Sequence, residues 1–153
     1  MKIQLELDSS LQECEVILRC PQVNEEIAEI QKALSQAMAP KREVIFYQGE
    51  KEFYLPIQEI LFFETGESGI HAHTAEQEFT VKQKLYELEE MLPAYFIRIS
   101  KSTIANTRQV YSITKNITSA SKVEFRNSYK VVYASRNYYK PLVDKMSTNV
   151  GRI

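Results

Sequence analysis

The sequence has little glycine, little cysteine and no long apolar run. Four glycines in 153 residues cannot supply a Gly-rich phosphate-binding loop, so nucleotide-driven chemistry is not expected. Two cysteines, Cys14 and Cys20, are too few for a disulfide scaffold, and their spacing differs from that of zinc or redox pairs. We expect both to act as small apolar residues. No run approaches the roughly 18 apolar residues of a membrane span, and the first residues lack the continuous apolar stretch of a signal peptide, which favours a cytoplasmic protein.

Charge is distributed unevenly along the chain, although the formal net charge is only −1. Residues 1–40 carry 3 basic and 7 acidic side chains, and residues 41–94 carry 5 and 11. Residues 95–153 carry 11 basic and 2 acidic side chains. A strongly basic segment attached to an acidic one points to nucleic acid or another anionic surface.

The first forty residues predict a small strand-strand-helix piece. Apolar and polar residues alternate over 3–7 and again over 14–18, which is typical of half-buried strands. From Pro21 the apolar spacing becomes helical, and the helix should end at a linker near residues 38–42. We expect residues 1–40 to serve dimerisation or partner contact, with covering the two strands as the simpler role of the helix.

The rest of the chain, residues 41–153, predicts a mainly β domain with one internal helix. Strands are expected around 44–47, 53–55 and 60–63, a hairpin over 70–81, and a second hairpin over 122–133 that turns at Asn127 and Ser128. Apolar residues at helical spacing predict the helix over 85–92, closed by Pro93. No long helix is expected in the basic third, so any base reading should come from loops or strand ends.

Three blocks of sequence carry a resemblance to a known family. Residues 57–65 read IQEILFFET, residues 92–106 read LPAYFIRISKSTIAN, and residues 134–136 read Ala-Ser-Arg. In this order they resemble the LytTR DNA-binding domain of bacteria, whose central motif has the form L-P-x-x-F-x-R-x-H-(K/R/N)-S. The resemblance extends over roughly residues 44–146, about two thirds of the chain.

The resemblance implies an elongated arrangement of small antiparallel sheets whose loops and strand ends enter the DNA major groove. It assigns base contacts to Lys101 and Arg136, and a third contact to the loop 66–69, for which we choose Ser68 over Glu67. An Arg fork suits guanine O6 and N7, and a Lys can donate to the same acceptors. Neighbouring polar residues suit phosphate contacts: Arg98, Ser100, Ser102, Ser135 and Asn137.

This chain departs from the family pattern at three motif positions. Ser100 replaces the usual His, Thr103 replaces an aromatic residue and Ala105 replaces Val. The operator sequence therefore cannot be transferred from relatives.

Other residue groups have simpler interpretations. His71 and His73 share a strand face but lack a third ligand, so half-exposed strand histidines are expected and no metal or cofactor. A cluster of tyrosines could stack on single-stranded bases, although core and cross-strand packing is the stronger expectation: Tyr129, Tyr133, Tyr138 and Tyr139. Asn106 suits a strand end and can serve the fold alone.

Taken together, these patterns predict a sequence-specific double-stranded DNA-binding transcriptional regulator that has no receiver domain and is not an enzyme. We expect promoter DNA with paired direct repeats as its partner, together with a second copy in a homodimer. The resemblance also implies a small membrane protein as a possible regulator. An RNA- or single-strand-binding β module and a protein-interaction module remain alternatives.

Overall fold

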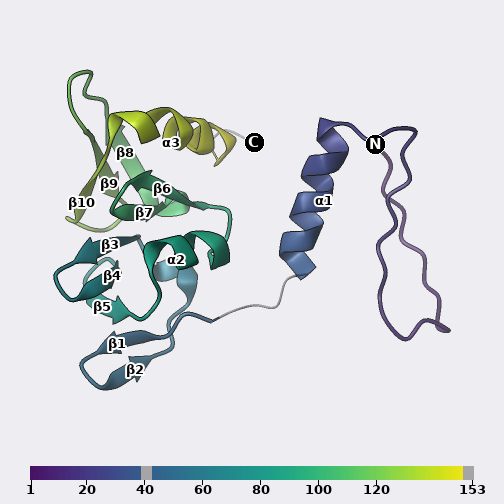
Figure 1. The fold of residues 1–153 in the computed structure, drawn as a ribbon, viewed down its shortest axis with the longest axis horizontal. Coiled ribbons are helices and arrows are strands. Elements are labelled where there is room, and N and C mark those ends of the chain that lie inside the picture. Colours follow the sequence, from purple (N-terminus) through teal and green to yellow (C-terminus); the bar gives the residue numbers. More distant parts are fainter. Residues whose placement is uncertain (39–42, 150–153) are drawn as a thin grey trace. The chain divides into compact units, whose positions relative to one another are not determined.

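The computed structural model describes residues 1–38 and 43–149. The chain divides into two compact units, Met1–Pro40 and Lys41–Ile153 (Figure 1). None of the helices in these described residues is long and apolar enough to span a bilayer.

The N-terminal unit contains one helix, α1 (Glu25–Met38). Asn24 caps it, since its Oδ1 accepts a hydrogen bond from Ile27 N at 3.0 Å. The expected helix is thus confirmed, but the two expected strands are wrong: residues 1–24 form no strand, and Figure 1 draws them as a loop without arrows. Residues 1–24 are all exposed, including Cys14 and Cys20, because the described part of the N-terminal unit itself contains no sheet or second layer on which these segments could bury an apolar face.

The second unit is built around a seven-stranded sheet with the order β2-β1-β5-β4-β3-β7-β6, in which every pair is antiparallel. The strands are β1 (Phe46–Gln48), β2 (Lys51–Phe53), β3 (Phe62–Gly66), β4 (Gly69–His73), β5 (Glu78–Val81), β6 (Phe96–Ser100) and β7 (Thr103–Asn106). The predicted hairpin over 70–81 is the β4–β5 pair.

Both faces of this sheet are covered. On β3, Phe63 belongs to a core cluster that includes Leu85 and Leu88 of α2 (Leu85–Met91), the predicted internal helix. Phe62, the residue before it, belongs to a second cluster on the opposite face, since successive strand residues point to opposite sides.

The second cluster lies under a smaller sheet and a third helix. The sheet has the order β10-β9-β8, formed by β8 (Val110–Thr114), β9 (Ser121–Phe125) and β10 (Val131–Ala134). Its β9–β10 pair confirms the predicted hairpin, and Asn127 at the turn has φ 56°. Leu142 of α3 (Arg136–Asn149) is buried in this cluster.

Helix α3 corrects the prediction that the basic third holds no long helix and that the domain has only one. It has 14 residues and contains Pro141, which the sequence pattern treats as a helix breaker. Burial of Leu142 against the small sheet outweighs this local cost.

Burial corrects two further expectations. Tyr129 and Tyr133 are exposed rather than packed in the core, although Tyr133 does pair across the strands with Lys122. His73 is buried rather than half-exposed, and its ring stacks on Phe62 with centroids 4.3 Å apart.

Candidate nucleic-acid interface

The first expected contact loop is the tight turn between β3 and β4. Gly66 pairs with Gly69, so Glu67 and Ser68 form its exposed tip. Gly69 has φ 118°, a conformation that L side chains rarely adopt, and the turn therefore requires glycine there. Ser68 Oγ lies 3.2 Å from His71 Nε2, so the tip is tied to the strand that follows it.

The second loop is the turn between β6 and β7, with Lys101 and Ser102 exposed at its tip. Ser100 Oγ accepts a hydrogen bond from Ser102 N at 3.2 Å and lies 3.3 Å from Ser102 Oγ. The strand register shifts between Arg98 and Ser100, and such a bulge changes the direction in which the following side chains point. Two serine hydroxyls thus lie together beside Lys101.

The third segment is the junction of β10 and α3, which carries Ser135, Arg136 and Asn137. Ser135 O accepts from Tyr138 N at 3.0 Å, which begins the first turn of α3. Arg136 and Asn137 are exposed in that turn. The partial positive charge of a helix N-terminus favours an anion at this position.

Two backbone hydrogen bonds bring these three segments to one edge of the molecule. Thr65 N, at the end of β3, donates to Ser102 O at 2.9 Å, which joins the first turn to the second. Ser135 N donates to Ile99 O at 2.9 Å, which joins the α3 junction to the end of β6. Residues separated by about seventy positions in the sequence therefore form one continuous surface, which we call the three-segment edge (turns 67–68 and 101–102, and junction 135–137).

Two lysines that the sequence analysis did not single out lie near this edge. Lys115 Nζ is 5.2 Å from the centroid of the Tyr139 ring, on the first turns of α3. Lys140 is exposed and follows Arg136 by four residues, so the two side chains share one face of the helix. In the sequence only their basic character marked these lysines, because their position near the three-segment edge depends on helix α3.

Arg98 is placed differently from the other expected contacts. Its side chain is only 20% exposed, and its Nε lies 3.7 Å from Glu89 Oε2 of α2. Its Nη1 is also buried, so the guanidinium of Arg98 is less accessible to a phosphate than the exposed side chains of the two turns.

Two histidines of β4, His71 and His73, form a polar cluster with side chains of neighbouring segments, and His71 also contacts Ser68 of the first turn. His71 Nδ1 lies 2.6 Å from Glu78 Oε1, and His73 Nε2 lies 2.9 Å from Glu64 Oε1. Lys130 Nζ lies 3.1 Å from His73 Nδ1. Burial, and then the Lys130 ammonium, lower the pKa of His73 despite the two carboxylates, so its neutral form is favoured.

Among the described residues no group of His, Cys, Asp and Glu could hold a metal ion.

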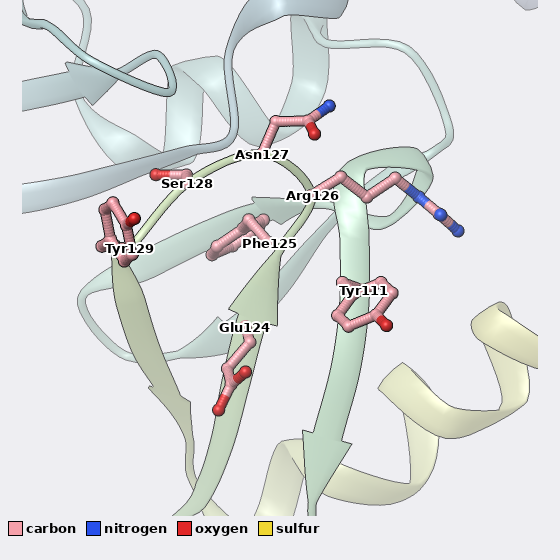
Figure 2. A pocket seen from close by; sticks show the side chains of 7 residues that line it. All are labelled: Tyr111, Glu124, Phe125, Arg126, Asn127, Ser128 and Tyr129. Atoms are coloured by element: carbon pink, nitrogen blue, oxygen red, sulfur yellow. The ribbon is translucent and has the colours of Figure 1, made fainter.

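A separate open groove lies at the β9–β10 turn and contains none of the eight expected contact residues. Figure 2 shows its lining side chains, which run from Tyr111 on β8 to Tyr129. The Arg126 guanidinium is 6.0 Å from the centroid of the Tyr111 ring. The charged side chains of its lining are one arginine and one carboxylate, Glu124, so the groove carries no net positive charge with which to attract duplex DNA.

The chain is similar in sequence to a known domain family and to two proteins of Staphylococcus aureus. The family model of the LytTr DNA-binding domain matches residues 50–147. An uncharacterized HTH-type transcriptional regulator of Staphylococcus aureus (strain NCTC 8325 / PS 47) is 25% identical over 147 residues, which cover 96% of this chain and 99% of the relative. A similarly named protein of the bovine strain RF122 / ET3-1 is 26% identical with the same coverage.

A solved structure also matches: the LytTr DNA-binding domain of a putative methyl-accepting/DNA response regulator from Bacillus cereus. It is 21% identical with a TM-score of 0.62, and the match covers 69% of this chain and 97% of that chain. In the described residues no two helices follow each other directly, because strands separate α1, α2 and α3. The matched family model spans about two thirds of the sequence, and the chain belongs to the LytTR DNA-binding domain family.

Proposed function

We propose that this protein regulates transcription by reading promoter DNA with its three-segment edge. Arg136 donates its fork to a guanine, Lys101 donates to base acceptors in the same groove, and Ser68 or Glu67 supplies the third base contact. Phosphates are held by polar and basic side chains around these contacts: Arg98, Ser100, Ser102, Ser135, Asn137, Lys115 and Lys140. The observation that carries the proposal is the pair of hydrogen bonds, Thr65 N to Ser102 O and Ser135 N to Ile99 O, that unites the three segments.

The charge distribution supports duplex DNA as the ligand. Lys101 and Arg136 belong to the basic segment, residues 95–153, whose net charge is +9, while the preceding 94 residues sum to −10. Attraction of this kind depends steeply on salt, because bound phosphates release counterions. Since bacterial DNA lies in the cytoplasm, the proposal places the protein there.

Binding to the DNA upstream of the protein's own gene, measured over a salt series, tests the proposal. We expect a specific duplex to bind at least a thousandfold more tightly than random duplex at physiological salt. Equal affinity for all duplexes would contradict it.

One observation favours a second candidate, a module that binds single strands. Tyr111, Tyr129 and Tyr133 are exposed, and Arg126 lies near the Tyr111 ring. Aromatic faces of this kind can stack on unpaired bases. Competition between duplex DNA, single-stranded DNA and RNA separates the two candidates, because a stacking module should prefer the unpaired strands.

The proposal extends to partners. Two copies associate through the N-terminal unit and place two DNA-binding units on paired repeats of the promoter, and a small membrane protein restrains the regulator. Light scattering that shows a monomer at high micromolar concentration, with and without DNA, would contradict the dimer. Failure of the full chain to co-purify with any membrane protein after mild detergent extraction of its native cells would contradict the membrane partner.

A further inference from the structure

The N-terminal unit exposes large apolar side chains that nothing within that unit buries. Ile3, Leu5 and Leu7 are 94%, 85% and 92% exposed, and Leu18 is 38% exposed. Contiguous apolar surface of this kind marks a protein–protein or membrane contact. Residues 2–7, which we call the first segment, thus form the most exposed apolar stretch of the N-terminal unit and are the best candidate for a contact with another molecule.

In the register of greatest overlap, the first segment meets like charges in the second segment, residues 13–19, of its own chain. The register that aligns the apolar residues of the two segments over their full length places Leu5 opposite Val16. It also places Lys2 opposite Arg19, Glu6 opposite Glu15 and Asp8 opposite Glu13. Like charges directly opposite each other destabilise an antiparallel pair, and a slip of one residue would turn the apolar side chains to the other face.

The same segment is complementary to itself in reverse. If two copies run antiparallel about a two-fold axis at Gln4, Lys2 lies opposite Glu6 of the second copy and Ile3 lies opposite Leu5 of the second copy. The symmetry forms each contact twice. Ionic and apolar pairs then alternate along the segment, which places the ionic pairs on one face and the apolar pairs on the other.

Local geometry favours this register. Gln4 Nε2 donates to Glu6 Oε1 at 3.2 Å, so these side chains already project on the same side of an extended backbone. Asp8 Oδ1 accepts from Ser10 N at 2.9 Å and from Ser10 Oγ at 2.6 Å, and Leu11 N donates to Asp8 O. Asp8 therefore belongs to the turn that follows, which ends the extended segment at Leu7.

We infer that two copies of this chain pair through residues 2–6, which form an antiparallel two-stranded ribbon across a two-fold axis at Gln4. The inference rests on the proposed dimer and names the contact that forms it. A two-stranded ribbon needs a cover for its apolar face, and α1 offers a half-buried apolar stripe in the same unit: Ile27, Ile30 and Leu34. A second copy fits better than an anionic membrane surface, because the N-terminal unit carries a net charge of −4.

Charge exchange tests the pairing on the full chain by sedimentation equilibrium. Lys2→Glu and Glu6→Lys each place like charges opposite one another at two positions of the dimer, and each variant alone should dimerise roughly tenfold more weakly than wild type. An equimolar mixture of the two single variants should recover association, because a chain with Lys2→Glu and a chain with Glu6→Lys then face each other with opposite charges. The double variant should recover it as well. A monomeric wild type, unaffected single variants, or a mixture as weak as its components would overturn the inference.

A disulfide test measures the register independently of charge. In a Cys14→Ser, Cys20→Ser background, Gln4→Cys places two thiols directly opposite each other, at a separation that a disulfide can bridge. Mild oxidation should give a covalent dimer. Leu5→Cys is the matched control, and its two thiols lie two residues out of register, so it should cross-link at least tenfold more slowly. Faster cross-linking of Leu5→Cys than of Gln4→Cys would overturn the register.

The pairing experiments and the DNA-binding experiments can fail independently of each other. Mass and cross-linking are measured without DNA, and the substituted positions lie outside the DNA-binding unit. A protein that pairs as inferred but binds no DNA sequence specifically would refute the function alone. One that binds DNA specifically but does not pair through residues 2–6 would refute the pairing alone.

Discussion

The replacement Asn106→Ala should destabilise the DNA-binding unit without touching the three-segment edge. Asn106 is 1% exposed at the end of β7. Its Nδ2 donates to Gln58 O at 3.2 Å and Ile60 O at 2.9 Å, and its Oδ1 accepts from Arg108 N at 3.0 Å. The side chain thus joins the loop before β3 to the 3₁₀ turn after β7 (Thr107–Gln109).

The size of the stability loss depends on which polar groups lose a hydrogen-bond partner. Gln58 O keeps its hydrogen bond from Gln109 Nε2 at 3.0 Å, so alanine removes partners chiefly from Ile60 O and Arg108 N. A buried polar group without its partner costs about 1–3 kcal/mol, and Arg108 is exposed enough for water to replace part of the loss. We expect the free energy of unfolding to fall by about 2–4 kcal/mol, which for a unit of this size lowers Tm by roughly 5–15 °C.

Urea denaturation monitored by circular dichroism at neutral pH measures this change. Asn116→Ala is the matched control, because Asn116 Oδ1 accepts from Thr118 N in an exposed loop and should cost less than about 0.5 kcal/mol. Asn106→Asp should cost more than alanine, because a carboxylate would face two carbonyl oxygens. If Asn106→Ala were no more destabilising than Asn116→Ala, the reasoning about this buried network would be wrong.

Three further predictions concern stability and binding. Burial and Lys130 hold the pKa of His73 below its ordinary 6.5, so the unfolded chain binds the proton more tightly than the folded chain does. The contribution of neutral His73 to the free energy of unfolding should therefore be fully present above about pH 6.5 and should be lost as the pH falls below it. His73→Gln should flatten that part of a Tm-versus-pH curve. Pro141→Ala should raise the free energy of unfolding in urea by roughly 1–3 kcal/mol, since an exposed alanine restores the helical N–H that proline lacks; no gain would mean that α3 tolerates the proline without cost. The double replacement Tyr129→Ala, Tyr133→Ala should change both duplex affinity and unfolding by less than about 0.5 kcal/mol, and a larger loss of binding in a titration would favour the single-strand module.

Local patterns in the sequence predicted most of the second unit. Alternating residues located the β4–β5 and β9–β10 hairpins, and helical spacing before Pro93 located α2. Helix α3 was missed because Pro141 and the tyrosines before it disfavour a helix locally, whereas the burial of Leu142 that stabilises it is a tertiary contact. The strands expected over 3–7 and 14–18 were wrong for the single chain because alternation reports an apolar face and not the surface that would cover it.

The individual residues of the candidate site could be predicted from the sequence, but their arrangement into one surface could not. The motif resemblance named Lys101, Arg136 and the turn that carries Ser68. Their proximity depends on hydrogen bonds between backbone atoms, such as Ser135 N to Ile99 O, which any sequence could form. The position of Lys115 over Tyr139 depends on the packing of α3 and has no local signature.

The central claim, that the three-segment edge reads bases, is tested most directly by the sequence preference of Arg136→Ala. Arg126→Ala is the matched control, because it removes the same charge from an exposed arginine in the groove of Figure 2. Affinities for a specific site and its single-base variants would be measured at fixed salt. We predict that Arg136→Ala loses about 1–3 kcal/mol on the specific site and tolerates any base at one position, whereas Arg126→Ala retains the full preference. Unchanged base preference in Arg136→Ala would contradict the account.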